Sequence, residues 1–133
     1  MKENNKFVEI IFEIKSYDID AAGHVNNAVY LNWLEDLRVK LFRDIFQLDF
    51  LVRNNIHLVV ASTNIKYKAP LFLFNRPRGI MEVDQYSRGV WYLSAKFKRG
   101  NSITTEAFQK CVFIDNNNNR RMVKNIIVNS ESE

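Results

Sequence analysis

Cysteine, histidine, glycine and proline are all scarce in this 133-residue sequence, which contains one Cys, two His, four Gly and two Pro. A single cysteine cannot form an intramolecular disulfide, so we expect a reducing compartment and a cytoplasmic protein. His24, His57 and Cys111 do not have the spacing of metal ligands, and no metal site is expected. The sequence also lacks the Gly-x-Ser-x-Gly motif of serine hydrolases and any glycine-rich phosphate-binding loop.

Long apolar runs are absent as well. No stretch approaches the roughly 18 apolar residues that a membrane-spanning helix needs, so we expect no membrane span. The polar segment Met1–Lys6 lacks the apolar core of a secretory signal. The formal net charge of +4 suits an anionic ligand. It falls short of a nucleic-acid-binding signature, so no nucleic acid partner is expected.

Apolar and aromatic residues are, by contrast, plentiful. They make up 47% and 13% of the chain, and ten Phe are among them. This composition is sufficient for a hydrophobic core and argues against disorder. Because the length fits one compact unit, we expect residues 1–133 to form a single domain with its core between about residues 7 and 128.

One long helix and about five strands are predicted. The helix is expected from about Asn27 to Phe46, because apolar residues recur there at spacings of three and four. A short helical turn is expected at Leu48–Arg53. Segments rich in β-branched and aromatic residues predict strands at Phe7–Lys15, Ile56–Lys68, Gly79–Tyr86, Val90–Arg99 and Ile103–Ile114, with a further edge strand at Met122–Val128. This order is typical of an α+β fold in which a curled antiparallel sheet wraps a central helix.

The most informative stretch lies between the first predicted strand and the helix. A carboxylate, a glycine, a histidine and two asparagines fall between Asp20 and Asn27. Asn26 or Asn27 can cap the helix, because a short amide side chain accepts a hydrogen bond from the first turn. The remaining N–H groups, at the positive end of the helix dipole, would polarise a carbonyl docked beside them. Asp20 is therefore the best candidate for a catalytic carboxylate, and an Asx turn is its structural alternative.

These residues resemble a known family. The pattern Tyr-x-x-Asp-x-x-Gly-His-Val-Asn-Asn-x-x-Tyr, from Tyr17 to Tyr30, is similar to the signature of hotdog-fold acyl-CoA thioesterases of the 4-hydroxybenzoyl-CoA thioesterase branch. The run Leu31–Arg38 and, more weakly, Ile65–Pro70 also match that branch. The resemblance implies a hotdog fold and the hydrolysis of an acyl-coenzyme A to free acid and CoA, with no cofactor.

The resemblance also implies roles for individual residues. Asp20 would act as a base or as a nucleophile on the thioester. Gly23 would let the backbone approach closely, while nearby backbone N–H groups hold the carbonyl oxygen. His24 would either orient substrate or water, or only satisfy backbone groups. The positions assigned to the oxyanion and to substrate positioning are Gly23, His24, Val25, Asn26 and Asn27.

Other acids lie near this motif. Some hotdog thioesterases use a carboxylate on the helix, so Glu35 is the alternative catalytic acid. An ion pair with Arg38, three residues further on, is the role we expect for it. Asp36 and Lys40 are predicted to form a second pair along the helix, and Asp18 is expected to face solvent.

Basic residues are candidates for binding the phosphates of coenzyme A. Arg88, Lys96, Lys98 and Arg99 all lie close to predicted strand turns. The mixture of basic and aromatic residues at Lys96–Arg99 also suits a small nucleic-acid-binding domain, although alternation on a solvated strand explains it more simply.

The resemblance implies a homodimer or homotetramer, because hotdog domains pair their sheets edge to edge and form active sites between subunits. Two alternatives to an acyl-CoA thioesterase remain open at this point. The thioester partner would be an acyl carrier protein, or the domain would bind an acyl thioester without cleaving it. The apolar run Leu71–Phe74 fits an acyl pocket, a subunit contact or a buried segment.

Overall fold

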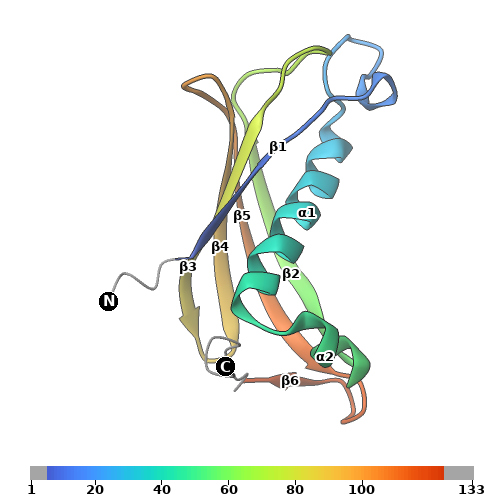
Figure 1. Ribbon diagram of the computed structural model, residues 1–133, viewed down its shortest axis with the longest axis vertical. Helices are drawn as coiled ribbons and strands as arrows, with labels where there is room; N and C mark the ends of the chain where they lie inside the picture. Colours follow the sequence, from blue (N-terminus) through green and yellow to red (C-terminus); the bar gives the residue numbers. More distant parts are fainter. Residues whose placement is uncertain (1–5, 125–133) are drawn as a thin grey trace.

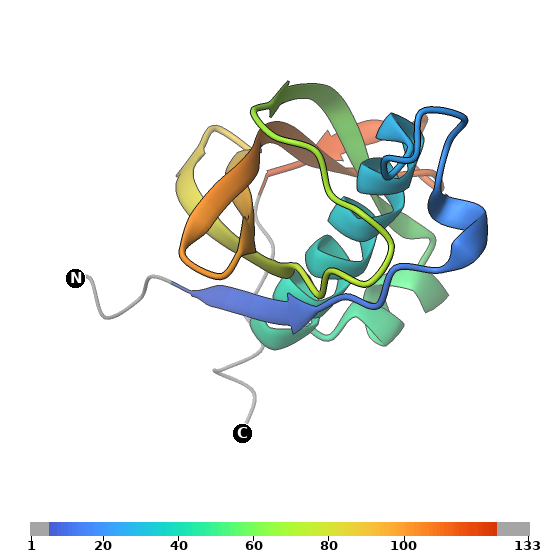
Figure 2. The same ribbon diagram turned by 90° about the horizontal axis from the view of Figure 1, so that it is seen from above.

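The fold is a curled antiparallel sheet with one long helix lying in its concave side, in a computed structural model that describes residues 6–124. This is the α+β hotdog architecture predicted from the sequence. Figure 2, viewed from above, shows the sheet curving around the helix. In chain order the elements are β1 (Phe7–Ile11), a 3₁₀ turn (Ser16–Asp18), α1 (Asn27–Ile45), α2 (Leu48–Arg53), β2 (Ile56–Tyr67), β3 (Arg78–Ser87), β4 (Val90–Arg99), β5 (Ser102–Asp115) and β6 (Arg121–Val123).

The strand order in the sheet is β1-β3-β4-β5-β2, and all neighbours are antiparallel. The short strand β6 pairs with the end of β5. The sheet therefore ends in β1 on one side and in the 12-residue strand β2 on the other. Within residues 6–124, no helix combines the length and the apolar character needed to cross a membrane.

The core lies between α1 and the concave face of the sheet. Leu34, Leu37 and Leu41 have no exposed surface, and they follow the spacing of three and four from which the helix was predicted. They pack against inward-facing residues of the sheet such as Met81 and Phe97, which are 1% and 0% exposed. Burial of this stripe, rather than helix propensity, holds α1 in place.

Aromatic rings concentrate at the two ends of α1. Near its start, the rings form what we call the site-end cluster: Phe12, Tyr30, Trp33, Tyr67 and Phe97. Near its end, they form the far-end cluster: Phe42, Phe46, Tyr86, Trp91 and Phe113. Tyr30 and Phe46 are separated along the helix by about 24 Å at 1.5 Å per residue.

Strand β1 is shorter than predicted, because it ends at Ile11 and not at Lys15. Its last paired residue, Ile11, lies opposite Arg78, the first residue of β3. The residue before Arg78 is Pro77, which has no N–H to donate to a ladder. The apolar alternation beyond Ile11 still reflects burial, because Phe12 and Ile14 are 6% and 7% exposed.

Two other segments also refine the sequence predictions. The last strand covers Arg121–Val123, and the remainder of the predicted strand up to Val128 lies outside the described residues. In the apolar run Leu71–Phe74, Leu71 is fully buried, whereas Phe72 and Phe74 are 45% and 92% exposed. The run is therefore divided between core and surface.

Candidate active site at the start of helix α1

The loop before α1 is folded around the Asp20 side chain. Asp20 Oδ1 accepts hydrogen bonds from the N–H groups of Ala22 at 2.9 Å and of His24 at 3.2 Å. The backbone closes the same turn, because Asp20 N–H donates to the His24 carbonyl at 2.8 Å and Gly23 N–H donates to the Asp20 carbonyl at 3.0 Å. The Asx turn is therefore present. Asp20 Oδ2 has no hydrogen-bond partner within residues 6–124 and remains available to a ligand.

Gly23 is needed for its backbone conformation. Its φ of +86° lies in the left-handed region, which residues with a Cβ rarely adopt. A Cβ atom at this position would meet no atom within 4 Å. The glycine therefore allows the tight turn and leaves open space beside it.

The N–H groups that follow are mostly occupied. Val25 N–H donates to the Leu71 carbonyl at 2.9 Å. Asn26 N–H donates to the Asp18 carbonyl at 2.8 Å. Gly23 N–H and His24 N–H donate to Asp20 within the loop, so all four backbone N–H groups from Gly23 to Asn26 already have acceptors inside the protein. Asn27 N–H, the first of the helix, has none among the described residues.

Asn26 is the N-cap of α1, as one of the two sequence alternatives predicted. Its side-chain Oδ1 accepts a hydrogen bond from Ala28 N–H at 3.0 Å, and its carbonyl accepts one from Val29 N–H at 2.9 Å. Because these N–H groups are capped, the positive potential of the helix start is directed mainly through the free amide of Asn27.

A cavity of about 260 Å³ opens beside this amide. Asp20, His24 and Asn27 line it on the side of the loop and helix. His24 also packs its ring edge-on against Phe72, with 5.2 Å between ring centroids. The opposite wall comes from the end of β2 and the segment after it, and the remaining lining residues are Val25, Tyr30, Tyr67, Lys68, Ala69 and Pro70. The cavity thus brings Asp20 and Asn27, the first residue of the helix, together.

Two tyrosines, Tyr30 and Tyr67, line the cavity. Burial raises the pKa of Tyr30, and it raises the pKa of Tyr67 as well. Both phenols are therefore protonated near neutral pH and act as hydrogen-bond donors, not as bases. Tyr67 Oη donates to the carbonyl of Asn27 at 3.3 Å, which ties the end of β2 to the start of α1.

The four basic residues considered for phosphate binding do not lie together. Arg88 lies in the turn between β3 and β4, at the opposite end of the sheet from the Asp20 loop (Figure 1). Lys96 and Lys98 alternate with buried Phe97 and so point away from the core. Arg99 alone reaches the site, because its Nη1 donates to the carbonyl of Pro70 at 3.0 Å.

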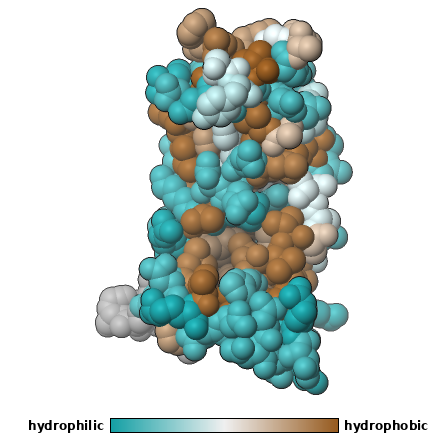
Figure 3. Space-filling model, turned by 90° about the vertical axis from the view of Figure 1, so that its right-hand side faces the viewer, coloured by the Kyte–Doolittle hydropathy of each residue, from teal (hydrophilic) through white to brown (hydrophobic). Residues whose placement is uncertain are grey.

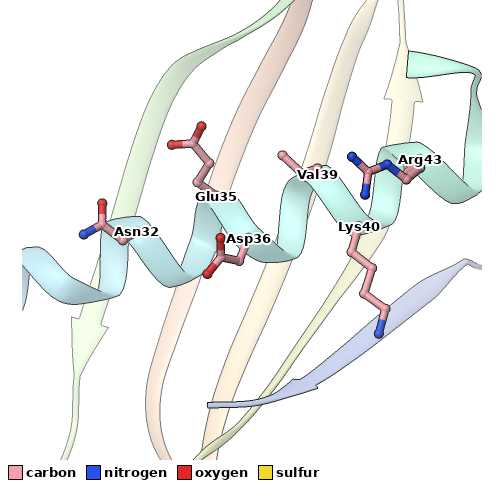
Figure 4. Close-up of a pocket in the computed structure, with 6 residues that line it drawn as sticks. All are labelled: Asn32, Glu35, Asp36, Val39, Lys40 and Arg43. Carbon is pink, nitrogen blue, oxygen red and sulfur yellow. The ribbon is translucent and has the colours of Figure 1, made fainter. Parts of the chain in front are cut away.

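Glu35, the alternative acid, lies on the outward face of α1 and not in the Asp20 cavity (Figure 4). The ion pair predicted between Glu35 and Arg38 is not formed, because Arg38 Nη1 instead donates to Gln109 Oε1 at 3.0 Å. Burial lowers the pKa of this guanidinium. The predicted pair of Asp36 with Lys40 is also not formed, since Lys40 Nζ donates to a backbone carbonyl of β1.

The sequence did not identify the far wall of the cavity. The sequence predicted that Tyr67 and Lys68 lie at the end of a strand, and it assigned them no role in the site. Lys68 Nζ forms an ion pair with Glu106 Oε1 at 3.2 Å at the edge of the cavity. The sequence feature that could have identified this wall is the partial family match at Ile65–Pro70, a segment that the fold brings opposite the Asp20 loop.

Solved structures of several thioesterases have the same fold. A probable thioesterase from Escherichia coli, YbaW, superimposes with a TM-score of 0.74 at 24% identity, covering 88% of this chain and 87% of that one. A mutant of 4-hydroxybenzoyl-CoA thioesterase complexed with 4-hydroxybenzoyl-CoA gives 0.78 at 16% identity, with coverages of 89% and 91%. A thioesterase from Thermus thermophilus complexed with coenzyme A and zinc gives 0.77 at 19% identity, with coverages of 89% and 84%.

Sequence comparison adds a family and a curated relative. The long-chain acyl-CoA thioesterase FadM of Escherichia coli K12 is 34% identical over 61 residues, which is 46% of this chain and 46% of that protein. The match thus spans less than half the length of the relative. The model of the thioesterase-like superfamily matches residues 14–124, most of the chain. This chain therefore belongs to the thioesterase-like superfamily.

Proposed function

We propose that this chain hydrolyses an acyl-coenzyme A thioester to a free carboxylic acid and CoA, and that it belongs to the 4-hydroxybenzoyl-CoA thioesterase branch. The observation that carries the proposal is the cavity that Asp20 and Asn27 both line, since Asp20 Oδ2 and the Asn27 N–H have no partner among the described residues. The family membership and the acyl-CoA thioesterase FadM among its relatives support it.

The two groups would act on opposite sides of the thioester carbonyl. Asp20 Oδ2 would either take a proton from a water that attacks the carbon, or attack the carbon itself. Asn27 N–H would donate to the oxygen as it gains negative charge. The C–S bond then breaks, and the CoA thiolate takes up a proton, which in the base route is the one that Asp20 removed from water. In the nucleophile route the thiolate is protonated by solvent, and a water then hydrolyses the acyl–Asp20 anhydride to release the acid and the Asp20 carboxylate. The reaction needs no cofactor, because coenzyme A is part of the substrate.

A second copy of the chain would complete the site. Within residues 6–124, β2 pairs only with β5, so the other edge of this 12-residue strand presents unpaired N–H and C=O groups. Long open edges of this kind pair readily with another strand. Tyr67, at the end of β2, lines the cavity, so a partner paired along β2 would border it. The proposed enzyme is therefore a homodimer, or a larger homo-oligomer, joined along β2.

Coenzyme A phosphates would meet the basic residues at the same end of the sheet. Lys68 lines the cavity, and Arg99 is held against Pro70 beside it. We assign the anionic part of the substrate to these two residues because Arg88 is remote from the cavity and Lys96 and Lys98 point away from the core.

Thiol release from a panel of acyl-CoA substrates tests the proposal. The panel should contain short and long aliphatic groups, aromatic groups and one acyl carrier protein substrate. We expect turnover by the wild-type chain, and a loss of about 10²-fold or more in Asp20→Asn, because the substituted amide is neither base nor nucleophile. Its oxygen can still accept the two loop hydrogen bonds, so folding should be unchanged.

Asp18→Asn is the matched control. The Asp18 carboxylate also accepts a loop hydrogen bond, from Lys15 N–H at 2.9 Å, but it does not line the cavity. This variant should keep its turnover. Full turnover by Asp20→Asn would remove Asp20 from the mechanism and would return Glu35 to consideration.

A non-catalytic binding domain is the second candidate. The Asx turn favours it, because two hydrogen bonds to Oδ1 already give the Asp20 carboxylate a structural role. Stoichiometric binding of an acyl-CoA without thiol release, across the whole panel, would establish this function and exclude hydrolysis.

A further inference from the structure

The loop between β2 and β3, residues 68–77, presents two phenylalanine rings to solvent. Phe74 is 92% exposed and Phe72 is 45% exposed, whereas Leu71 is fully buried and Leu73 packs partly against the core. Outward and inward side chains therefore alternate along the loop, and the two rings are directed away from the core. A single exposed apolar residue is common at a protein surface, but a group of them marks a contact with another molecule.

Hydrogen bonds within the protein hold this loop in one conformation. Phe72 N–H donates to Asn75 Oδ1 at 2.8 Å, and the Phe72 carbonyl accepts from the N–H groups of Phe74 at 3.1 Å and of Asn75 at 2.9 Å. The Leu71 carbonyl accepts from Val25 N–H at 2.9 Å. Unpaired backbone groups are costly in an apolar environment. Because most of these groups are already paired, the tip of the loop can enter such an environment at low cost.

The charge around the two rings is of one sign. Residues 66–78 contain four basic residues and no acidic residue. Two of the four, Lys68 and Arg78, form ion pairs with acids outside this segment. Arg76, two residues after Phe74, is exposed and forms no hydrogen bond or ion pair among the described residues. Its guanidinium is therefore available to an anionic partner.

The loop lies at the same end of the molecule as the Asp20 cavity (Figure 1). The Phe72 ring packs edge-on against His24, which lines that cavity, with 5.2 Å between ring centroids. Figure 3 shows hydrophobic surface among hydrophilic residues at this upper end of the molecule. A surface that receives the two phenylalanine rings would therefore lie beside the cavity.

We propose that this loop docks the protein on an anionic lipid bilayer, with Phe72 and Phe74 inserted between the headgroups and Arg76 against the lipid phosphates. Apolar rings on a cationic surface suit this layer, because apolar burial and attraction to anionic lipids both contribute to binding. A folded protein partner fits less well. Two phenylalanine side chains offer at most about 500 Å², whereas a stable protein interface covers about 800 Å² on each partner.

Docking would also bring the cavity to the place where an amphipathic thioester collects. An acyl-CoA with a long chain holds that chain in the bilayer and keeps its charged part in water. The contact between Phe72 and His24 would set the cavity next to the thioester of such a molecule. This consequence rests on the proposed function, whereas the docking itself does not.

Cosedimentation of the full chain with lipid vesicles at low salt tests the docking. Vesicles of phosphatidylcholine alone are compared with an equal mixture of phosphatidylcholine and phosphatidylserine. The wild type should bind the mixed vesicles and bind those of phosphatidylcholine much more weakly. Phe74→Ser should weaken binding to the mixed vesicles by about 10-fold, because one ring is no longer buried. Arg76→Glu should weaken it by a similar factor, about 10-fold, through charge reversal.

The matched controls lie on α2, at the other end of the molecule (Figure 1). Phe50 is 52% exposed and Arg53 is also exposed, so Phe50→Ser and Arg53→Glu make the same changes away from the loop. Both variants should bind the mixed vesicles as the wild type does. Insertion has its own readout: the added fluorescence of Phe74→Trp should be quenched by lipids brominated on their acyl chains, and that of Phe50→Trp should not.

The outcomes separate the bilayer from other partners of the loop. A wild type that ignores mixed vesicles, or that binds them equally well as Phe74→Ser, would overturn the docking. If the wild type ignores vesicles and Phe74→Ser instead loses binding to an acyl carrier protein, the loop binds that protein and the docking is wrong. A lower sedimenting mass of Phe74→Ser without vesicles would likewise overturn it, in favour of a subunit contact.

The proposed function fails separately from the docking. Phe74→Ser should release thiol from a short-chain, water-soluble acyl-CoA at the wild-type rate, because Phe74 does not line the cavity. If no acyl-CoA is hydrolysed while vesicle binding changes as expected, the proposed function is wrong and the docking stands.

Discussion

The two aromatic clusters at the ends of α1 contain the same number of rings but pack differently. In the far-end cluster, Phe42 and Phe46 meet Trp91 and Phe113 at interplanar angles of 87–90°, and Phe46 is 1% exposed. In the site-end cluster, Tyr67 is 45% exposed and lines the cavity. The Phe42, Phe46 and Phe113 rings of the far-end cluster are buried and carry no polar atoms, and its exposed ring, Tyr86, does not line the cavity. The site-end cluster instead opens into the cavity at Tyr67.

This difference separates stability from function along one helix. Closely packed rings that exclude water contribute most to the free energy of folding. A site must instead leave space and unpaired polar groups, which reduces packing around it. We therefore expect substitutions in the buried rings to change stability without changing chemistry, and substitutions of residues that line the cavity to change chemistry more than stability.

Phe46→Ala should have the largest effect on stability. Removing a fully buried ring leaves a cavity, and such changes lower the free energy of unfolding by about 3–5 kcal/mol. Urea denaturation measures the loss. Turnover well below the unfolding temperature should be retained. Phe50→Ala is the control, because that ring is 52% exposed and its loss should cost about 0.5 kcal/mol or less. Equal losses in the two variants would contradict the far-end cluster as the centre of stability.

Gly79→Ala should have the next largest effect, at the site-end cluster. A Cβ at Gly79 would lie 2.7 Å from Phe12 and 3.1 Å from Phe97, so both rings must shift. Such overpacking costs typically about 1–3 kcal/mol. Gly23→Ala is the informative comparison, because that position has open space but a positive φ. We expect Gly79→Ala to lower the urea midpoint and Gly23→Ala to lower mainly turnover, since its loop holds Asp20.

The elements of the fold were largely predictable from the sequence. α1 was predicted to end at Phe46 and ends at Ile45, and Leu48–Arg53 is helical as predicted. Periodicity works here because it reports which side of an element is buried. It does not report strand pairing, which explains why β1 was extended past Ile11. Beyond the Ile11–Arg78 pair, the only backbone bond between these two segments among the described residues is the one that Phe12 N–H donates to the Pro77 carbonyl at 2.9 Å.

The site was predictable only in its local part. Asp20 and the Asn26 cap could be read from neighbouring residues. The sequence could not show which loop N–H groups already have acceptors, because Val25 N–H donates to the carbonyl of Leu71, a residue far along the chain. Tyr67 was missed for the same reason, since it meets Asn27 only through the fold. Arg38 likewise bonds to a residue of β5 in place of its neighbour on the helix.

Cys111, buried on β5 between the two clusters, gives a pH-dependent prediction. Burial raises the pKa of its thiol from 9.0 to about 11, and Arg38 opposes this in part. The folded state thus holds the proton more tightly than the unfolded state. The stabilisation is complete below pH 9 and is lost as the pH rises towards 11, by at most about 1.4 kcal/mol per pH unit. Urea midpoints at pH 8 and 10.5 should differ less in Cys111→Ala than in the wild type. An identical difference would contradict the burial of this thiol.

Tyr67→Phe should have the smallest effect, and it tests the site end most finely. The change removes one exposed hydrogen bond of 3.3 Å to Asn27 but keeps the ring, whose centroid lies 5.3 Å from that of Tyr30. Stability should therefore fall by only about 0.5–1 kcal/mol. Because the hydroxyl fixes the helix start whose N–H we propose to polarise the substrate, kcat should fall a few-fold while KM stays nearly constant. Tyr67→Ala, which also removes the ring from the cavity wall, should raise KM as well. A KM change without a kcat change in Tyr67→Phe would mean that the hydroxyl binds substrate and does not position the helix.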